Sequence, residues 1–146
     1  MNDHDNIAIK VNGIKLYLNI MGLVYAEIQL SNPVLQGSMP VNIKCLVDSG
    51  ATYLCITQHV ANQLGLKELH QKEAQLADGS SKLLPYVGPI KVEFMNRVCF
   101  VGAMVLGDEC LLGAIPMEDM DLVIIPKLFK LSVNPESPNV ARGKVK

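Results

Sequence analysis

The amino-acid sequence predicts an all-β domain, built as a sandwich or a barrel and interrupted by two short helices. Its apolar residues fall in short runs, many of them alternating with polar residues, and this period is typical of strands. Gly, Pro, Asn and Asp recur between the runs, where these residue types favour turns. With 146 residues, the chain has the length of one domain.

The first twenty residues predict an extra hairpin or a leader. Two apolar-rich runs within residues 1–20 flank Asn12 and Gly13, a dipeptide that favours a two-residue hairpin turn. A new strand pattern begins shortly after Met21, which resembles a second chain start. Residues 1–20 are therefore either an added element or a leader outside the core, and residues 21–139 form the predicted domain.

Six further segments are predicted as strands. The first alternates apolar and polar residues, the second follows a turn that contains proline, and the third is rich in residues that favour strands. The fourth and fifth flank Met95 and Asn96, and the last is a short apolar run near the end of the chain. In order, they are residues 23–30, 41–47, 53–57, 88–94, 97–105 and 128–133.

Two short helices are predicted between these strands. Thr57 is a suitable N-cap for residues 58–64, and Gly65 is suited to end that helix. The second helix is predicted to begin at Pro116, since proline suits the first helical position and acidic residues follow it. The polar end of the chain has neither pattern, and residues 140–146 are predicted to be disordered.

The composition argues against several classes of protein. The net charge is -1 and no basic stripe is present, so nucleic acid is not an expected partner. The longest apolar stretch, residues 98–106, is too short to span a bilayer, and no signal peptide is evident. We therefore expect no membrane association and a cytoplasmic location. Four cysteines stand singly in apolar runs, which predicts reduced, buried thiols and no metal site: Cys45, Cys55, Cys99 and Cys110.

One short motif carries the candidate chemistry. Apolar residues 45–47 lead directly into Asp48, Ser49 and Gly50, so that a strand delivers a carboxylate into a mostly apolar setting. Ser49 is able to hydrogen-bond locally, and Gly50 permits a tight turn. Alone, such a motif more often marks an ordinary turn. Two features further along the chain change this interpretation: a predicted hairpin tip at residues 78–79, and a Leu-Leu-Gly sequence that opens the second helix.

This ordered set of motifs resembles the retropepsin-like (clan AA) aspartic peptidases. It is most similar to the small bacterial members with a single catalytic motif, which are related to the retroviral proteases. The matching stretches are residues 22–28, 45–52, 77–80, 111–113, 116–124 and 134–139. The resemblance implies a closed acid-protease-like β-barrel, equivalent to a half-size pepsin lobe.

The resemblance also implies roles for individual residues. Asp48 would be the catalytic residue, and Ser49, which stands where many relatives have threonine, would keep the supporting hydroxyl. Gly50 and Ala51 would complete the active-site loop. The flap over the substrate would contain Ala77, Asp78, Gly79 and Ser80. An apolar shelf beneath the loop would contain Leu111, Leu112 and Gly113. No metal or other cofactor is expected.

A homodimer that cleaves a peptide or protein substrate follows from the same resemblance. The chemistry needs two carboxylates that share one proton, yet the chain has a single Asp-Ser-Gly motif. Two copies of Asp48 would therefore meet across a two-fold axis, and the predicted function is that of an aspartic endopeptidase. The hydrophobic content of 49% agrees either with a buried partner surface or with a strand-rich core.

Other functions fit the sequence less well. A serine hydrolase built on Ser49 and His59 would need a Gly-x-Ser-x-Gly elbow, which the chain lacks. A plain barrel scaffold does not explain the ordered motifs. The main alternative is a homodimeric retropepsin-fold module that binds extended peptides without cleaving them, because a fold alone does not establish an activity.

Overall fold

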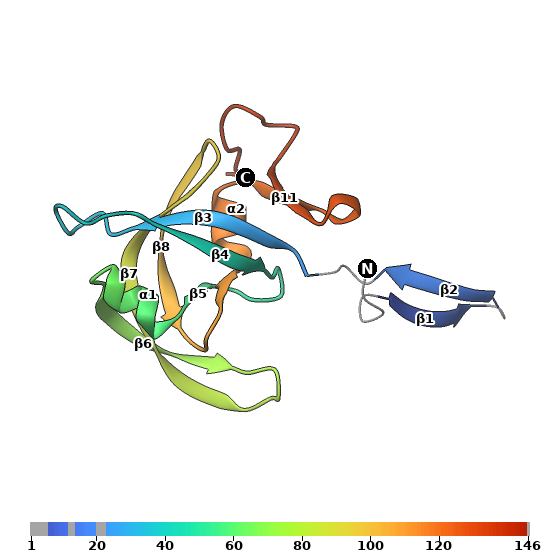
Figure 1. The fold of residues 1–146 in the computed structure, drawn as a ribbon, viewed down its shortest axis with the longest axis horizontal. Helices are drawn as coiled ribbons and strands as arrows, with labels where there is room; N and C mark the ends of the chain where they lie inside the picture. The colour runs from blue at the N-terminus through green and yellow to red at the C-terminus, as the bar shows by residue number, and fades with distance from the viewer. Residues whose placement is uncertain (1–5, 12–13, 20–22, 146) are drawn as a thin grey trace.

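A closed β-barrel forms the body of the protein in a computed structural model, which describes residues 6–11, 14–19 and 23–145. The barrel sheet has the strand order β3-β4-β9-β5-β8-β7-β6, and a further pairing of β3 with β7 closes six of these strands on themselves (Figure 1). The all-β prediction is confirmed, and the architecture is a barrel. The strands are β3 (Tyr25–Ser31), β4 (Val41–Val47), β5 (Leu54–Ile56), β6 (Lys67–Gln75), β7 (Ser81–Phe94), β8 (Arg97–Val105) and β9 (Cys110–Leu112).

The short central strands position the barrel core. β9 pairs in parallel with β4, so that Val47 lies opposite Leu112, and β5 pairs in parallel with β8. All three residues of β5 are buried, as expected for a strand covered on both faces. On β3, by contrast, buried Ile28 and Leu30 alternate with more exposed neighbours, as expected for a strand with one face toward solvent.

The two predicted helices are present, and one of them begins earlier than predicted. Helix α1 (Gln58–Gln63) follows Thr57, whose side-chain oxygen accepts a hydrogen bond of 3.2 Å from the Val60 amide, as an N-cap does. Helix α2 (Ala114–Asp119) begins at Ala114, and the predicted start at Pro116 is wrong by two residues. Pro116 is accommodated because the amides of a first helical turn have no partner within the helix.

The flanking strands differ from the prediction in four places. Strand β6 was not predicted, and β7 starts at Ser81 where the sequence indicated residue 88. Strand β10 (Leu122–Ile125) was also missed; it pairs with β11 (Lys130–Val133) in a separate small sheet. The last strand was predicted over residues 128–133, but β11 starts two residues later. A short 3-10 helix, η2 (Pro126–Leu128), occupies the beginning of the predicted segment.

The N-terminal segment forms a hairpin of its own. Strands β1 (Asn6–Val11) and β2 (Ile14–Asn19) pair antiparallel and make a separate two-stranded sheet (Figure 1). The predicted turn at Asn12 and Gly13, and the predicted domain start at Met21, lie outside the described residues. The division of the chain at that point stays a prediction.

Asp121 holds the C-terminal segment against the barrel. One carboxylate oxygen accepts hydrogen bonds from the Ser137 hydroxyl and from the Arg142 amide, the latter at 3.0 Å, and the other accepts from the Asn134 side chain at 3.1 Å. These bonds lower the pKa of Asp121 to about 2, with the Ser137 hydroxyl as the largest cause. The chain is therefore tied down by polar contacts as far as Arg142.

Candidate active site

Asp48 lies directly after β4, on a loop held by backbone hydrogen bonds. Its amide donates to the Leu112 carbonyl at 3.0 Å, and its own carbonyl accepts from the Ala51 amide at 3.1 Å. One oxygen of the partly exposed carboxylate, Oδ1, accepts from the Gly50 amide at 2.9 Å. The main chain thus fixes both the position of the residue and the orientation of its acidic group.

Gly113 explains why the second motif contains a glycine. The Ala51 carbonyl accepts a hydrogen bond from the Ala114 amide at 2.7 Å, so the start of α2 packs directly against the Asp48 loop. A Cβ atom at position 113 would lie 2.2 Å from the Tyr53 carbonyl oxygen and 2.7 Å from that of Ala51. Only a residue without a side chain permits this approach.

The three residues predicted as an apolar shelf lie in three different environments. Leu111, opposite Leu46 in the strand register, lines the cleft in front of Asp48. Leu112 is fully buried and belongs to the main core of the barrel. Gly113 packs on the backbone of the Asp48 loop. The structure therefore brings all three close to the loop, but only Leu111 lines the cleft.

A cleft of about 640 Å³ joins the Asp48 loop to the hairpin of β6 and β7. Asp48, Gly50 and Ala51 line it from the loop, and Ala77 lines it from the hairpin; Ser49 is exposed and is not among the lining residues. The hairpin projects from the barrel on the side where β4 ends (Figure 1). Further lining residues, which were not among the predicted site residues, are Thr52, Tyr53, Cys55, Glu73, Ala74, Gln75, Leu76, Leu84, Met104 and Leu106.

The predicted flap residues form the tip of this hairpin. The Gly79 amide donates to the Leu76 carbonyl at 2.9 Å, and Gly79 has a φ of +86°. The amide and the hydroxyl of Ser80 both donate to Asp78 Oδ1, at 2.9 and 2.6 Å. These two bonds, the hydroxyl one above all, lower the pKa of Asp78. Asp78, Gly79 and Ser80 are exposed, and Ala77 alone of the predicted set reaches the cleft.

Cys55 is the cysteine that lines the cleft beside Asp48. It is buried on β5, at the wall of the cleft. Burial raises its pKa to about 11, and the negative charge of Asp48 is the second cause. All four cysteines are free and buried, as the sequence predicted. His59, the base that a serine hydrolase would need, is exposed on α1 and does not line the cleft.

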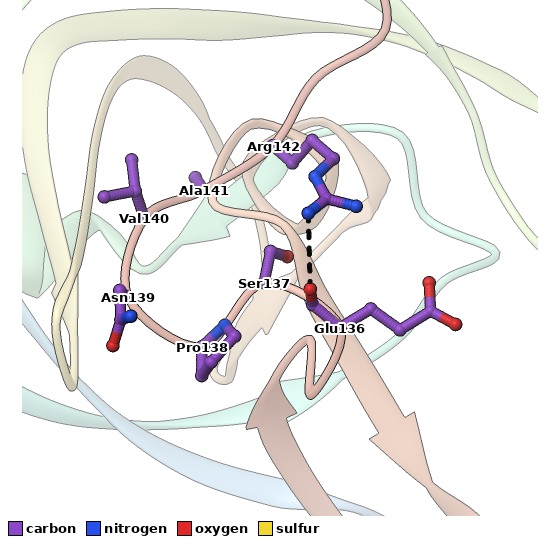
Figure 2. A pocket seen from close by; sticks show the side chains of 7 residues that line it. All are labelled: Glu136, Ser137, Pro138, Asn139, Val140, Ala141 and Arg142. Carbon is purple, nitrogen blue, oxygen red and sulfur yellow. Dashed lines mark hydrogen bonds between the residues drawn. The ribbon is translucent and has the colours of Figure 1, made fainter.

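A second cavity, of about 360 Å³, lies within the C-terminal segment. Figure 2 shows residues 136–142 curling around it, with the Arg142 guanidinium donating to the Glu136 carbonyl at 3.4 Å. The one hydroxyl on its wall, that of Ser137, is already bonded to Asp121. This cavity holds no second acid, base or nucleophile in a catalytic arrangement, and the cleft at Asp48 is therefore the candidate active site.

Two further findings concern the described part of the chain. Residues 6–11, 14–19 and 23–145 contain no group of three His, Cys, Asp or Glu side chains placed to hold a metal ion. Within the same residues, no helix has the length and apolar character needed to cross a bilayer.

A carboxylate on a tight loop at the end of a barrel strand, facing a hairpin across a cleft, defines an acid-protease type of barrel. The chain belongs to the family described as gag-polyprotein putative aspartyl protease, whose model matches residues 40–118. The matched stretch includes Asp48, the β6–β7 hairpin and Gly113. The predicted membership of the retropepsin-like aspartic peptidases is confirmed.

The comparison with solved structures includes the EIAV protease in complex with the inhibitor HBY-793. It shares 15% sequence identity with this chain, and the match covers 71% of this chain and 93% of the viral one at a TM-score of 0.47. No curated protein sequence matches the chain.

Proposed function

We propose that the protein is an aspartic endopeptidase that cleaves peptide bonds with a water molecule held between two Asp48 carboxylates of a homodimer. The observation that carries this proposal is the position of Asp48, fixed by the main chain in a cleft that the β6–β7 hairpin also lines. Family membership supports the reaction type. A single motif per chain supports the dimer, because the mechanism uses two carboxylates.

The proposed mechanism divides the two carboxyl groups into a base and an acid. Two like charges in close contact do not both ionise, so one Asp48 keeps a proton while the other is charged. The charged copy removes a proton from water, whose oxygen attacks the carbonyl carbon of the peptide bond. The protonated copy donates to the carbonyl oxygen, and a proton then passes to the departing amine. The Gly50 amide keeps Asp48 oriented throughout.

The cleft also supports a preference for apolar substrates. Its wall contains Leu76, Leu84, Met104, Leu106 and Leu111. Burying apolar side chains of a peptide against this wall is favourable, at roughly 25 cal/mol per Å² of apolar surface removed from water. We therefore expect apolar residues on both sides of the cleaved bond.

Asp48→Asn tests the mechanism, because the amide keeps the shape of the side chain and cannot act as a base. A peptide-library digest at several pH values should show cleavage by the wild type with a bell-shaped profile in the mildly acidic range. The variant should lose activity by about 10²–10⁴-fold or more. Asp119→Asn, an exposed change on α2, is the matched control and should retain activity.

Mixed dimers test the shared site. An excess of Asp48→Asn chains should inhibit the wild type, because each mixed dimer has only one Asp48 carboxylate and the mechanism uses two. Light scattering run beside the assay should show the mass of two chains for the active species. The proposal would be contradicted by undiminished turnover of Asp48→Asn, or by full activity in a species with the mass of one chain. Peptide binding without cleavage would indicate the binding module instead.

A further inference from the structure

Lys72, on β6, contacts two tyrosine rings at the base of the hairpin. Its ammonium lies 4.8 Å from the centre of the Tyr53 ring and 4.4 Å from that of Tyr86. It also donates a hydrogen bond of 3.4 Å to the Tyr53 hydroxyl. The two rings meet edge to face, with their centres 5.9 Å apart. A cation within about 6 Å of an aromatic ring centre is attracted to the ring, and the ammonium is this close to both rings.

Tyr86 also packs closely on β8 of the barrel. It lies over Gly102 of β8, where a Cβ atom would stand 2.2 Å from the tyrosine ring. Gly102 therefore leaves the space that the ring fills, and Tyr86 packs on the barrel wall. Lys72 and Tyr53 both contact this ring, and we name these three residues the Lys72 cluster.

The Lys72 cluster lies where the hairpin leaves the barrel. Tyr86 is the first residue of β7 that pairs with β8, opposite Met104. Beyond this point, β6 and β7 pair only with each other, from Lys72 opposite Leu84 to Gln75 opposite Ser81. Residues 73–83 thus form an arm whose attachment to the barrel begins at the cluster.

Tyr53 connects the same cluster to the catalytic loop. Its side chain lies on the wall of the cleft, and its carbonyl oxygen packs on Gly113, next to the carbonyl of Ala51. Tyr53 thus contacts Lys72 through its side chain and Gly113 through its main chain. In the described structure, Lys72 is the cation that joins the arm to this loop.

We propose that Lys72 is a positioning residue. Through its contacts with Tyr53 and Tyr86, it sets the resting position of the arm, residues 73–83, relative to the Asp48 loop. This inference rests on the proposed function and extends it, because it names the device that aligns the two walls of the cleft. Without the ammonium, the arm keeps the apolar packing of Ala74 against Cys55, Leu84 and Met104 but loses its polar contact with Tyr53, and it closes less well on a bound peptide. Lys72 takes no part in the chemical step.

Hydrogen exchange of the free protein tests the inference without reference to activity. Lys72→Met keeps the length of the side chain and removes the charge, and Lys72→Arg keeps the cation and its contact with the rings. We expect amides of residues 73–83 to exchange about fivefold faster in Lys72→Met and at nearly the wild-type rate in Lys72→Arg. Lys82→Met, an exposed change on the same arm, is the matched control and should leave exchange unchanged.

Kinetics give the second measurement. In Lys72→Met, KM for a cleaved peptide should rise about fivefold with a smaller change in kcat, and Lys72→Arg should restore it.

Tyr53→Leu, which removes one ring and leaves the lysine, should reproduce the faster exchange and replaces Lys72→Met if that variant does not fold. Wild-type exchange in both Lys72→Met and Tyr53→Leu would overturn the inference. If no variant, the wild type included, cleaves peptides but the exchange pattern holds, the proposed function fails and the positioning role stands.

Discussion

Two turns in this protein share a local structure and differ in everything around them. In each, an aspartate accepts a hydrogen bond of 2.9 Å from the amide two residues later: Asp48 from Gly50, and Asp78 from Ser80. The first turn is packed against β9 and the start of α2. The second has an exposed tip, and a Cβ atom at Gly79 would meet nothing within 4 Å. The same hydrogen-bonded turn thus occurs once packed against the barrel, at Asp48, and once exposed to solvent, at Asp78.

The glycines of the two regions are required for opposite reasons. Gly113, beside the first turn, has a φ of -90° that suits any residue, but it has no room for a side chain. Gly79 has ample room, but its φ of +86° is rarely adopted by other residues. A reacting carboxylate needs a rigid support, whereas a segment that closes over a substrate needs freedom to move. The following predictions test whether the two regions differ in this way.

Gly113→Ala should have the largest effect. The new methyl group meets two backbone carbonyls, which cannot rotate away as a side chain can. We expect a loss of about 3 kcal/mol or more in the free energy of unfolding, measured by urea denaturation. Gly143→Ala, where a Cβ atom has open space, is the control and should leave the midpoint unchanged. A Gly113→Ala protein as stable as the wild type would show that the loop is not packed as described.

Gly79→Val should affect turnover more than stability. The substitution strains the turn at positive φ, at a cost of about 1–3 kcal/mol that falls mainly on the hairpin tip. Turnover should drop because closure over the substrate is impaired, while the urea midpoint of the barrel changes little. Gly79→Asn is the matched control, since asparagine tolerates positive φ. Normal cleavage by Gly79→Val would place the flap elsewhere.

Alkylation of Cys55 should report the charge of Asp48. The pKa of about 11 keeps this thiol protonated at neutral pH, through burial first and the Asp48 charge second. Asp48→Asn removes that charge, so the Cys55 pKa should fall and more thiolate should be present at a given alkaline pH. We expect iodoacetamide to modify Cys55 about twofold to fivefold faster, measured by mass spectrometry. Cys99, whose pKa burial and Asp119 raise to about 12, is the internal control.

Acid should loosen the hairpin tip at Asp78, and this is the smallest of the expected effects. The lowered pKa of Asp78 means that its bonds to Ser80 stabilise the turn above the ordinary aspartate pKa of about 3.9. This contribution is lost as the pH falls through the lowered value. Hydrogen exchange of residues 76–80, corrected for intrinsic rates, should therefore increase in strong acid. Asp78→Ala should show the faster exchange already at neutral pH, and equal protection in both proteins would contradict the role of Asp78.

The sequence predicts this molecule well where the signal is local. The strand leading into Asp48, the N-cap at Thr57 and the hairpin tip at Gly79 each follow from a few adjacent residues. Strand β6 was missed because its composition is mostly polar and charged, so that neither apolar alternation nor a buried run marks it. The Lys72 cluster was missed because it joins residues 19 positions apart and depends on space left by a distant glycine.

Strand β6 has a further consequence for the behaviour of the protein in solution. Among the strands of the barrel sheet, β6 alone pairs with a single neighbour, so one side of its backbone offers unpaired amides and carbonyls to any passing strand. Exposed edges of this kind favour aggregation, and natural proteins protect them with charged side chains. Four of the nine residues of β6 are charged: Lys67, Glu68, Lys72 and Glu73. The polar sequence that made β6 difficult to predict thus protects the protein, whose residues are 49% hydrophobic, from edge-to-edge association with other chains.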